Sequence, residues 1–224
     1  STRDWSSDVC SSDLQPQAVY LELMQSVRAR LDFVMNLAAA AGDPFSRAET
    51  AAFHGRKVIE GIAFACLVAT DHGLKHVPSD ARGKWNAREI LQALKKKNLQ
   101  VFPSPSVIRP ATPEERAANG VESTIEGIKE RRLSHKELID IYERLHGWLH
   151  EMNPYVSSGR DGFIRARGQQ LWADLQSVNR FIEQHFISIQ GEAFFCVLRD
   201  SVDGHTKVAS LSKTSDIGGV QLRA

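Results

Sequence analysis

Side chains that can carry out chemistry are concentrated in residues 134–154, SHKELIDIYERLHGWLHEMNP. Tyr142, His146 and His150 recur every four residues, a spacing that aligns them along one face of a helix beside an apolar stripe. Asn153 follows close by. Imidazole can give or take a proton near neutral pH, and two histidines four residues apart can also bind a metal ion. This segment is therefore the first candidate for an active or binding site.

A metal site needs more ligands than these two histidines provide. A catalytic zinc ion normally takes a third protein ligand. Glu151 falls on another face of the helix, and the chain contains no H-E-x-x-H pattern. The alternative is a pair of hydrogen-bonded histidines at the rim of the core. We therefore expect no metal ion and no other cofactor.

The sequence around the histidines predicts the helix that carries them. Ser134 and Glu137 have the S-x-x-E spacing of a capping box, so the helix begins there. It should continue as far as Pro154. Apolar side chains spaced three and four apart form its buried stripe: Leu138, Ile141, Leu145, Trp148 and Met152. The histidines should therefore lie at the edge of a contact between helices.

The most apolar stretch is Phe53–Ala69, FHGRKVIEGIAFACLVA. Its apolar residues cover more than one face of a helix, which predicts a helix packed by several neighbours. Charged residues interrupt the stretch, and a bilayer requires roughly 20 apolar residues in a row, so we expect no membrane partner. Arg56 and Glu60 lie four residues apart and can form a structural ion pair at the rim of the core. The alternative is a polar site between helices.

Similar periodicity predicts long helices over 16–41 and 163–186, and short connections favour antiparallel neighbours. Residues 187–211 combine two β-like segments with a turn, which predicts a hairpin. The fold class is therefore mainly α, an antiparallel helical bundle over 15–186 with a small C-terminal β-hairpin packed on the helices. Residues 212–224 are expected to form a flexible tail.

Residues 4–14, DWSSDVCSSDL, resemble the conceptual translation of a sequencing-adapter oligonucleotide. We therefore treat residues 1–14 as an artefact outside the fold, and expect the natural chain to start near Gln15 with its true N-terminus missing. These residues carry one arginine and three aspartates, so without them the formal net charge rises from +1 to +3. This weak positive bias permits nucleic-acid binding without requiring it.

Two cysteines lie outside that stretch, Cys66 in the apolar helix and Cys196 in a β-like run. Isolated cysteines with apolar neighbours are typical of reduced core residues, and not of a disulfide framework or a zinc site. This pattern favours a cytoplasmic protein.

A helical domain whose late helix carries an arginine, followed after four to six residues by a histidine, resembles the HEPN superfamily. Many of its members are metal-independent RNases of bacterial defence and toxin systems. The motif here would be Arg144–His150, with His146 inside it. The resemblance implies that His150 acts as general acid or base, and that Arg144 stabilises charge on an RNA phosphate attacked by the ribose 2′-hydroxyl. The same loose spacing also fits Arg47–His54, Arg180–His185 and Arg199–His205.

Context favours the first of these pairs, because His146 and Asn153 lie beside it. An ideal helix places residues six apart about 120° out of phase. Arg144 therefore needs its long side chain, or a bend at Gly147, to reach His150.

Residues 45–211 also resemble, more narrowly, a group of bacterial proteins. These share an RK-x-x-E core helix, here Arg56–Ala69, an LH-x-x-NP turn, here Leu149–Pro154, and a final hairpin. This second resemblance concerns fold more than function.

Arginines elsewhere in the chain are candidates for holding a nucleic-acid strand. Arg160 and Arg165 lie near the start of the last long helix, where cations oppose the helix dipole, so an anionic partner would explain them. Arg131 and Arg132 form a second basic pair. The alternative for each is a solvated surface.

Two functions follow from these patterns. The first is a HEPN-like bacterial RNase that is independent of metal and works as a homo-oligomer. Its catalytic residues would be Arg144, His146 and His150, with Tyr142 and Asn153 among the substrate contacts. The alternative is a binding or regulatory module without catalysis, whose partner is RNA or another nucleic acid, a nucleotide or a protein.

Overall fold

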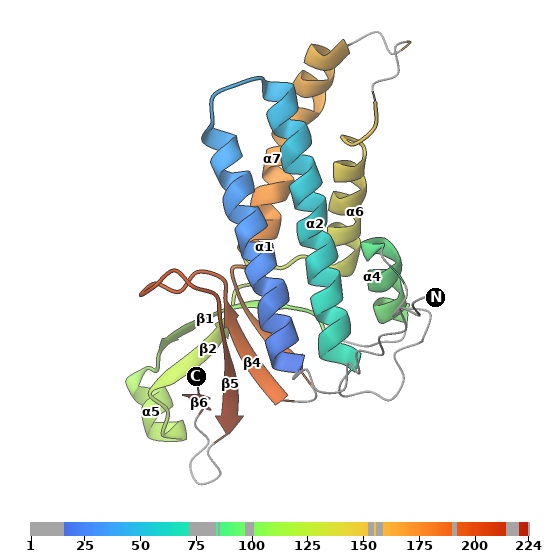
Figure 1. Cartoon of the computed structure of the whole chain (residues 1–224). Coiled ribbons are helices and arrows are strands. Elements are labelled where there is room, and N and C mark those ends of the chain that lie inside the picture. The colour runs from blue at the N-terminus through green and yellow to red at the C-terminus, as the bar shows by residue number, and fades with distance from the viewer. Residues whose placement is uncertain are drawn as a thin grey trace, which may run out of the picture.

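A computed structural model describes residues 16–71, 84, 86–96, 101–151, 155, 159–189, 192–213 and 220–223. The adapter-like residues 1–14 and Asn153 lie outside these ranges. The protein is mainly helical, with an antiparallel sheet at one end of a bundle (Figure 1). The long helices of the bundle are α1 (Pro16–Ala39), α2 (Pro44–Asp71), α6 (His135–His146) and α7 (Gly159–Ile182).

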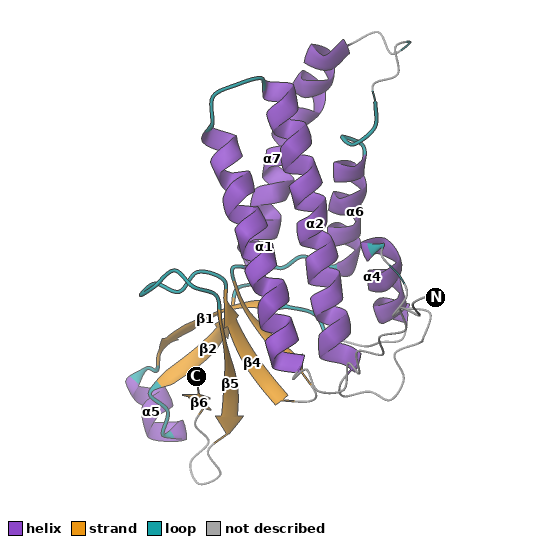
Figure 2. Ribbon diagram, in the orientation of Figure 1, coloured by secondary structure: helices purple, strands orange, loops and turns teal. Residues whose placement is uncertain are grey.

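Helix α2 is the centre of the bundle. It packs against α1, α6, α7 and the short helix α4 (Ala87–Lys96), and its lower end also touches the sheet (Figure 2). Side chains on several of its faces are buried, including Ile59, Ala63 and Ala65. The prediction of a core helix with neighbours on several sides is therefore confirmed.

The helix starts show which capping signals operate. At α6 the Ser134 hydroxyl accepts from the Glu137 N–H, and the Glu137 carboxylate accepts from the Ser134 N–H, so the predicted capping box is present. At α2 the helix begins at Pro44. The Asp43 carboxylate accepts from the Ser46 N–H at 2.7 Å, so Asp43 caps this helix start.

The end of α6 differs from the prediction of a helix that continues to Pro154. The helix ends at His146, and the next bonds span three residues: the Trp148 N–H donates to Leu145 and the Leu149 N–H to His146. Such bonds tighten a last turn and satisfy its carbonyl groups. His150 therefore lies in the turn that follows the helix.

The β region is larger than the predicted hairpin. Among the described residues, six antiparallel strands lie in the order β2-β1-β3-β4-β5-β6. Their bounds are β1 (Ser104–Pro110), β2 (Ser123–Gly127), β3 (Gln184–Ile189), β4 (Glu192–Val197), β5 (Lys207–Lys213) and β6 (Val220–Arg223). The short helix α5 (Pro113–Asn119) joins β1 to β2, and a single turn η1 (Lys129–Arg131) follows β2.

Local periodicity predicted only the part of the sheet formed by β3, β4 and β5. Strand β1 pairs with β3 through Ser104–Phe186 and Pro105–His185, a pairing across about eighty residues that no local pattern reveals. The boundary predicted at residue 187 falls inside β3, and residues 220–223 of the predicted tail form β6.

The sheet shares one hydrophobic core with the helices. Ile187, Phe194 and Cys196 belong to the same buried cluster as the side chains of α1, α2, α6 and α7. A buried hydrogen bond of 2.6 Å between the Tyr20 hydroxyl and His185 Nε2 ties α1 to β3. The hairpin residues are therefore part of the main body. Within the described ranges, we find no helix that is both long and apolar enough to cross a membrane.

Candidate functional site

Five polar side chains form a connected cluster where α2 packs against α6. We call it the Arg56 cluster, and its members are Arg56 and Glu60 of α2, Tyr142 and His146 of α6, and His150 of the following turn. Because α6 is amphipathic, Tyr142 and His146 lie one turn apart at the edge of its buried stripe. Sequence spacing thus aligned the α6 residues, and packing against α2 added the other two.

Arg56 connects the members of the cluster. Its Nε donates to the Glu60 carboxylate at 3.3 Å, its Nη2 to the Tyr142 hydroxyl at 2.6 Å, and its Nη1 to His146 Nδ1. The guanidinium also lies over the Tyr142 ring, 4.4 Å from its centroid. A guanidinium has five N–H groups, so these bonds leave two for a ligand.

Glu60 is buried but shares its charge among several donors. Lys57 donates to its Oε2 at 2.7 Å, and the Tyr142 hydroxyl to its Oε1 at 3.1 Å, in addition to Arg56. A buried carboxylate needs such partners. The Glu60 carboxylate therefore pairs with two cations, Arg56 and Lys57, and these three side chains together carry a net positive charge.

The hydrogen bonds fix how protons are arranged on the two histidines. Because Arg56 can only donate, His146 accepts at Nδ1, and a neutral His146 carries its proton on Nε2. That proton is donated to His150 Nε2, 3.1 Å away, so a neutral His150 carries its own proton on Nδ1. The chain of bonds runs from Arg56 through His146 to His150.

Electrostatics favours the neutral form of His146. Its pKa is lowered from the ordinary value by partial burial, by the Arg56 charge and by His150. The pKa of Tyr142 is raised, mainly by burial and the charge of Glu60, so its hydroxyl stays protonated. The cluster therefore presents a neutral imidazole beside a permanent cation at neutral pH.

The cluster opens into a small surface pocket of about 200 Å³. Its lining includes Arg56 of α2, Tyr142 and His146 of α6, and Asn86 and Arg88 at the start of α4. Arg88 pairs with the rim residue Glu143 at 3.1 Å. The His150 side chain is exposed beside this pocket, so an anionic group could reach Arg56 and both histidines from solvent.

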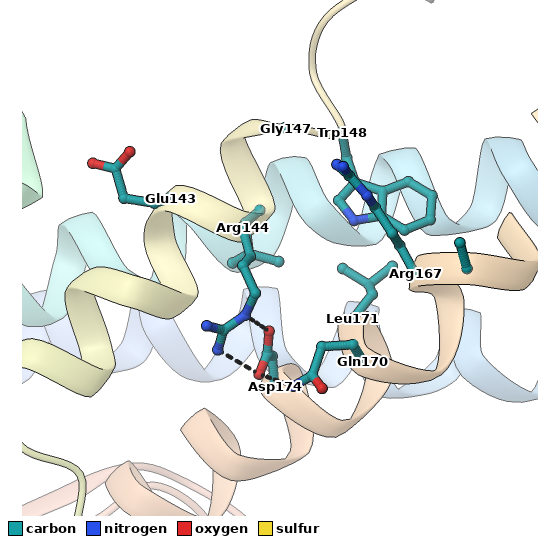
Figure 3. Close-up of a pocket in the computed structure, with 10 residues that line it drawn as sticks. Glu143, Arg144, Gly147, Trp148, Arg167, Gln170, Leu171 and Asp174 are labelled. Atoms are coloured by element: carbon teal, nitrogen blue, oxygen red, sulfur yellow. Dashed lines mark hydrogen bonds and ion pairs between the residues drawn. The ribbon is translucent and has the colours of Figure 1, made fainter. Parts of the chain in front are cut away.

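Arg144 lies on a different side of α6. Its Nε and Nη2 donate to the two carboxylate oxygens of Asp174 in α7, at 2.7 and 2.9 Å (Figure 3). Gln170 donates to the same carboxylate at 2.8 Å. This pair lies in the wall of a cavity of about 600 Å³ between α6 and α7, which also includes Trp148 and Arg167.

The predicted pairing of Arg144 with His150 is therefore not what the structure shows. Arg144 and His146 are two residues apart, about 200° around a helix, so they face different neighbours. Gly147 keeps a right-handed helical conformation and supplies no bend that would bring Arg144 back. The arginine that contacts a histidine is Arg56. The sequence signal for Arg56 was its four-residue spacing from Glu60, which has two interpretations: a structural ion pair or a polar site between helices.

The other predicted arginines make separate contacts. Arg131 pairs with Glu183 at 3.2 Å, and Arg160 lies over the Phe45 ring at 5.0 Å. Arg132 and Arg165 are exposed. In the described parts of the chain, no hydrogen bond, ion pair or ring contact joins these four side chains to the Arg56 cluster, and Asn153 lies outside those parts.

Other candidate groups are accounted for by burial. Cys66 and Cys196 are unpaired and buried, and burial raises the pKa of the Cys66 thiol to about 12, so it stays protonated at neutral pH. Among the residues that the structure describes, no three histidine, cysteine, aspartate or glutamate side chains are grouped so as to hold a metal ion.

Comparisons with protein-family models, with curated proteins and with solved structures gave no match to this chain.

Proposed function

We propose that the protein is a HEPN-like, metal-independent RNase whose reaction takes place at the Arg56 cluster. The observation that supports this proposal is the contact of one guanidinium with a pair of hydrogen-bonded histidines at an open pocket. A cation and two imidazoles are sufficient for phosphodiester cleavage when the ribose 2′-hydroxyl is the nucleophile. The arginine of this site is Arg56 and replaces Arg144 in that role.

The proposed reaction divides the work among three side chains. When RNA binds, the hydrogen bond between the two histidines opens, and the freed Nε2 of a neutral His150 takes the proton of the 2′-hydroxyl, which attacks the phosphorus. The other imidazole, in its protonated form, gives its proton to the departing 5′-oxygen. Arg56 donates its remaining N–H groups to the phosphate oxygens on which negative charge grows. The products are a 2′,3′-cyclic phosphate and a 5′-hydroxyl, and the rate should follow a bell-shaped pH profile.

The test is RNA cleavage by the purified protein in EDTA. His146→Ala and His150→Ala should each lower the rate by about 10²–10⁴-fold, the usual contribution of a general acid or base. His205→Ala is the matched control, since this exposed histidine lies in the turn before β5. Cleavage that survives both cluster substitutions, in protein whose circular dichroism is unchanged, would rule the proposal out.

A second function remains, that of a module that binds RNA without cutting it. The observation that favours it is the tie between Arg56 and Glu60, because a carboxylate beside a phosphate site weakens the attraction for the anion. Binding of RNA that is lost in Arg56→Gln, with no cleavage by the wild-type protein in EDTA or in magnesium, would support this function over the RNase.

A further inference from the structure

An aromatic ridge lies on the surface where α1 packs against α2. It consists of Phe33 of α1 and of Phe53 and His54 of α2. The His54 ring lies between the other two, with its centroid 4.6 Å from that of Phe33 and 5.3 Å from that of Phe53. Phe33 and Phe53 are 43% and 46% exposed. Aromatic rings with that exposure lose the benefit of burial, so a ligand that covers them would gain stability.

This ridge is continuous with the Arg56 cluster. Phe53 precedes Arg56 by three residues and Lys57 by four, so all three are neighbours on the surface of α2. Helix α2 lies between α1 and α6 in Figure 1 and packs against both of them. A ligand seated at Arg56 can therefore extend across α2 to Phe53 and then to Phe33.

Cations accompany the aromatic rings along this path. Lys57 is 44% exposed at its side chain. Arg30 donates to His54 Nδ1 at 3.3 Å, so a neutral His54 carries its proton on Nε2. Burial and the Arg30 charge lower the pKa of His54, which keeps its ring neutral and able to stack. Glu60 offsets one of the positive charges, and the net charge along the path from Arg56 to Phe33 is positive.

Aromatic faces beside cations match a single nucleic-acid strand. Unpaired bases stack on exposed aromatic rings, while nearby cations neutralise the phosphates. Paired bases are already stacked within a duplex and present only their edges in the grooves, so a ridge of rings cannot reach their faces.

We propose that Phe53, His54 and Phe33 stack unpaired bases next to the phosphate held at the Arg56 cluster, so that the substrate is single-stranded RNA. The part of this inference that concerns a substrate rests on the proposed RNase function. The stacking itself is a binding property and can be measured without cleavage.

The experiment measures binding of a fluorescein-labelled single-stranded RNA of twelve nucleotides by anisotropy, in EDTA and with His150→Ala protein so that the RNA stays intact. Phe53→Ala and Phe33→Ala should each weaken binding by about tenfold, within the range that one stacked base contributes. Val202→Ala, which alters an exposed apolar side chain on the turn between β4 and β5, should leave binding unchanged. The same sequence as a duplex should bind more weakly and respond little to the ridge variants.

The outcomes separate this inference from the proposed function. Ridge variants that lose single-strand binding, in a protein whose wild type does not cut RNA, would support the ridge and end the RNase proposal. A wild type that cuts RNA, with ridge variants that bind and cut as well as it does, would overturn the ridge alone. Ridge variants that change the mass measured by light scattering, with RNA binding intact, would show that the ridge is a protein interface and would also overturn the inference.

Discussion

Two arginines on different sides of α6 are held in contrasting ways. Arg144 meets a single buried carboxylate, Asp174, through two parallel hydrogen bonds. Arg56 divides its donors among Glu60, a tyrosine hydroxyl and an imidazole, and Glu60 also serves Lys57. The first arrangement neutralises its guanidinium one to one. The second leaves excess positive charge next to groups that can transfer protons.

The difference shows why residue type and spacing do not locate an active site. A bidentate ion pair with a buried partner satisfies the cation and fixes two helices relative to each other. A cation whose partners are mostly neutral keeps its attraction for an incoming anion. We therefore assign a structural role to Arg144, although the α6–α7 cavity beside it is the larger one.

The largest expected effect is on RNA cleavage. Arg56→Gln should lower the rate by about 10²–10³-fold, the usual loss when one donor to a developing oxyanion is removed. Arg144→Gln should stay within about threefold of wild type after correction for the folded fraction, since a structural ion pair contributes nothing to the transition state. Single-turnover rates of both variants decide the comparison. The reverse order of effects would make Arg144 the catalytic arginine.

The stability of the protein at acid pH should depend mainly on the buried His185, which belongs to neither arginine site. Burial lowers its pKa from 6.5 to about 4. The unfolded chain therefore takes up this proton first, and the free energy of unfolding should fall by about 3 kcal/mol as the pH drops from about 6.5 to about 4. Urea unfolding against pH measures this slope. His185→Gln should flatten it, and an unchanged slope would attribute the effect to other groups, such as His146.

Removing Arg144 should mainly reduce stability. Arg144→Ala leaves the Asp174 carboxylate buried with Gln170 as its remaining partner. We expect the free energy of unfolding to fall by about 2 kcal/mol, less than for a fully buried pair because Arg144 is itself half exposed. Chemical denaturation measures the change. A loss as large for Arg56→Ala would remove the contrast between the two sites.

The smallest expected effect is on the ionisation of His146. Its pKa is lowered partly by the Arg56 charge, so Arg56→Gln should raise this pKa, while Arg144→Gln should leave it in place. Because the folded pKa lies below the ordinary value, the stability that His146 contributes is present above about pH 6.5 and declines at lower pH. Titration of the ring protons by NMR reports the pKa directly. Equal shifts in both variants would contradict the assignment.

Local patterns predicted part of the fold. The capping box at Ser134 and the apolar period of α6 both operate as expected, because a helix start and an amphipathic face depend on residues within one or two turns. The same periodicity showed that Phe53–Ala69 is surrounded by other elements. The pairing of β1 with β3 was not predictable in this way, because these two strands lie far apart in the sequence.

The candidate site, like the fold, was predictable only in part. Tyr142 and His146 share a face of α6 because of their four-residue spacing, which can be read from the chain alone, whereas His150 lies in the turn after the helix. The choice of Arg56 as their cation was made by the packing of α2 against α6, which joins residues eighty-six and ninety positions apart. The sequence by itself thus determined which side chains share a helix face. The tertiary structure decided which helix faces pack against each other. Such packing depends on the burial of whole surfaces and on side chains that are far apart in the sequence.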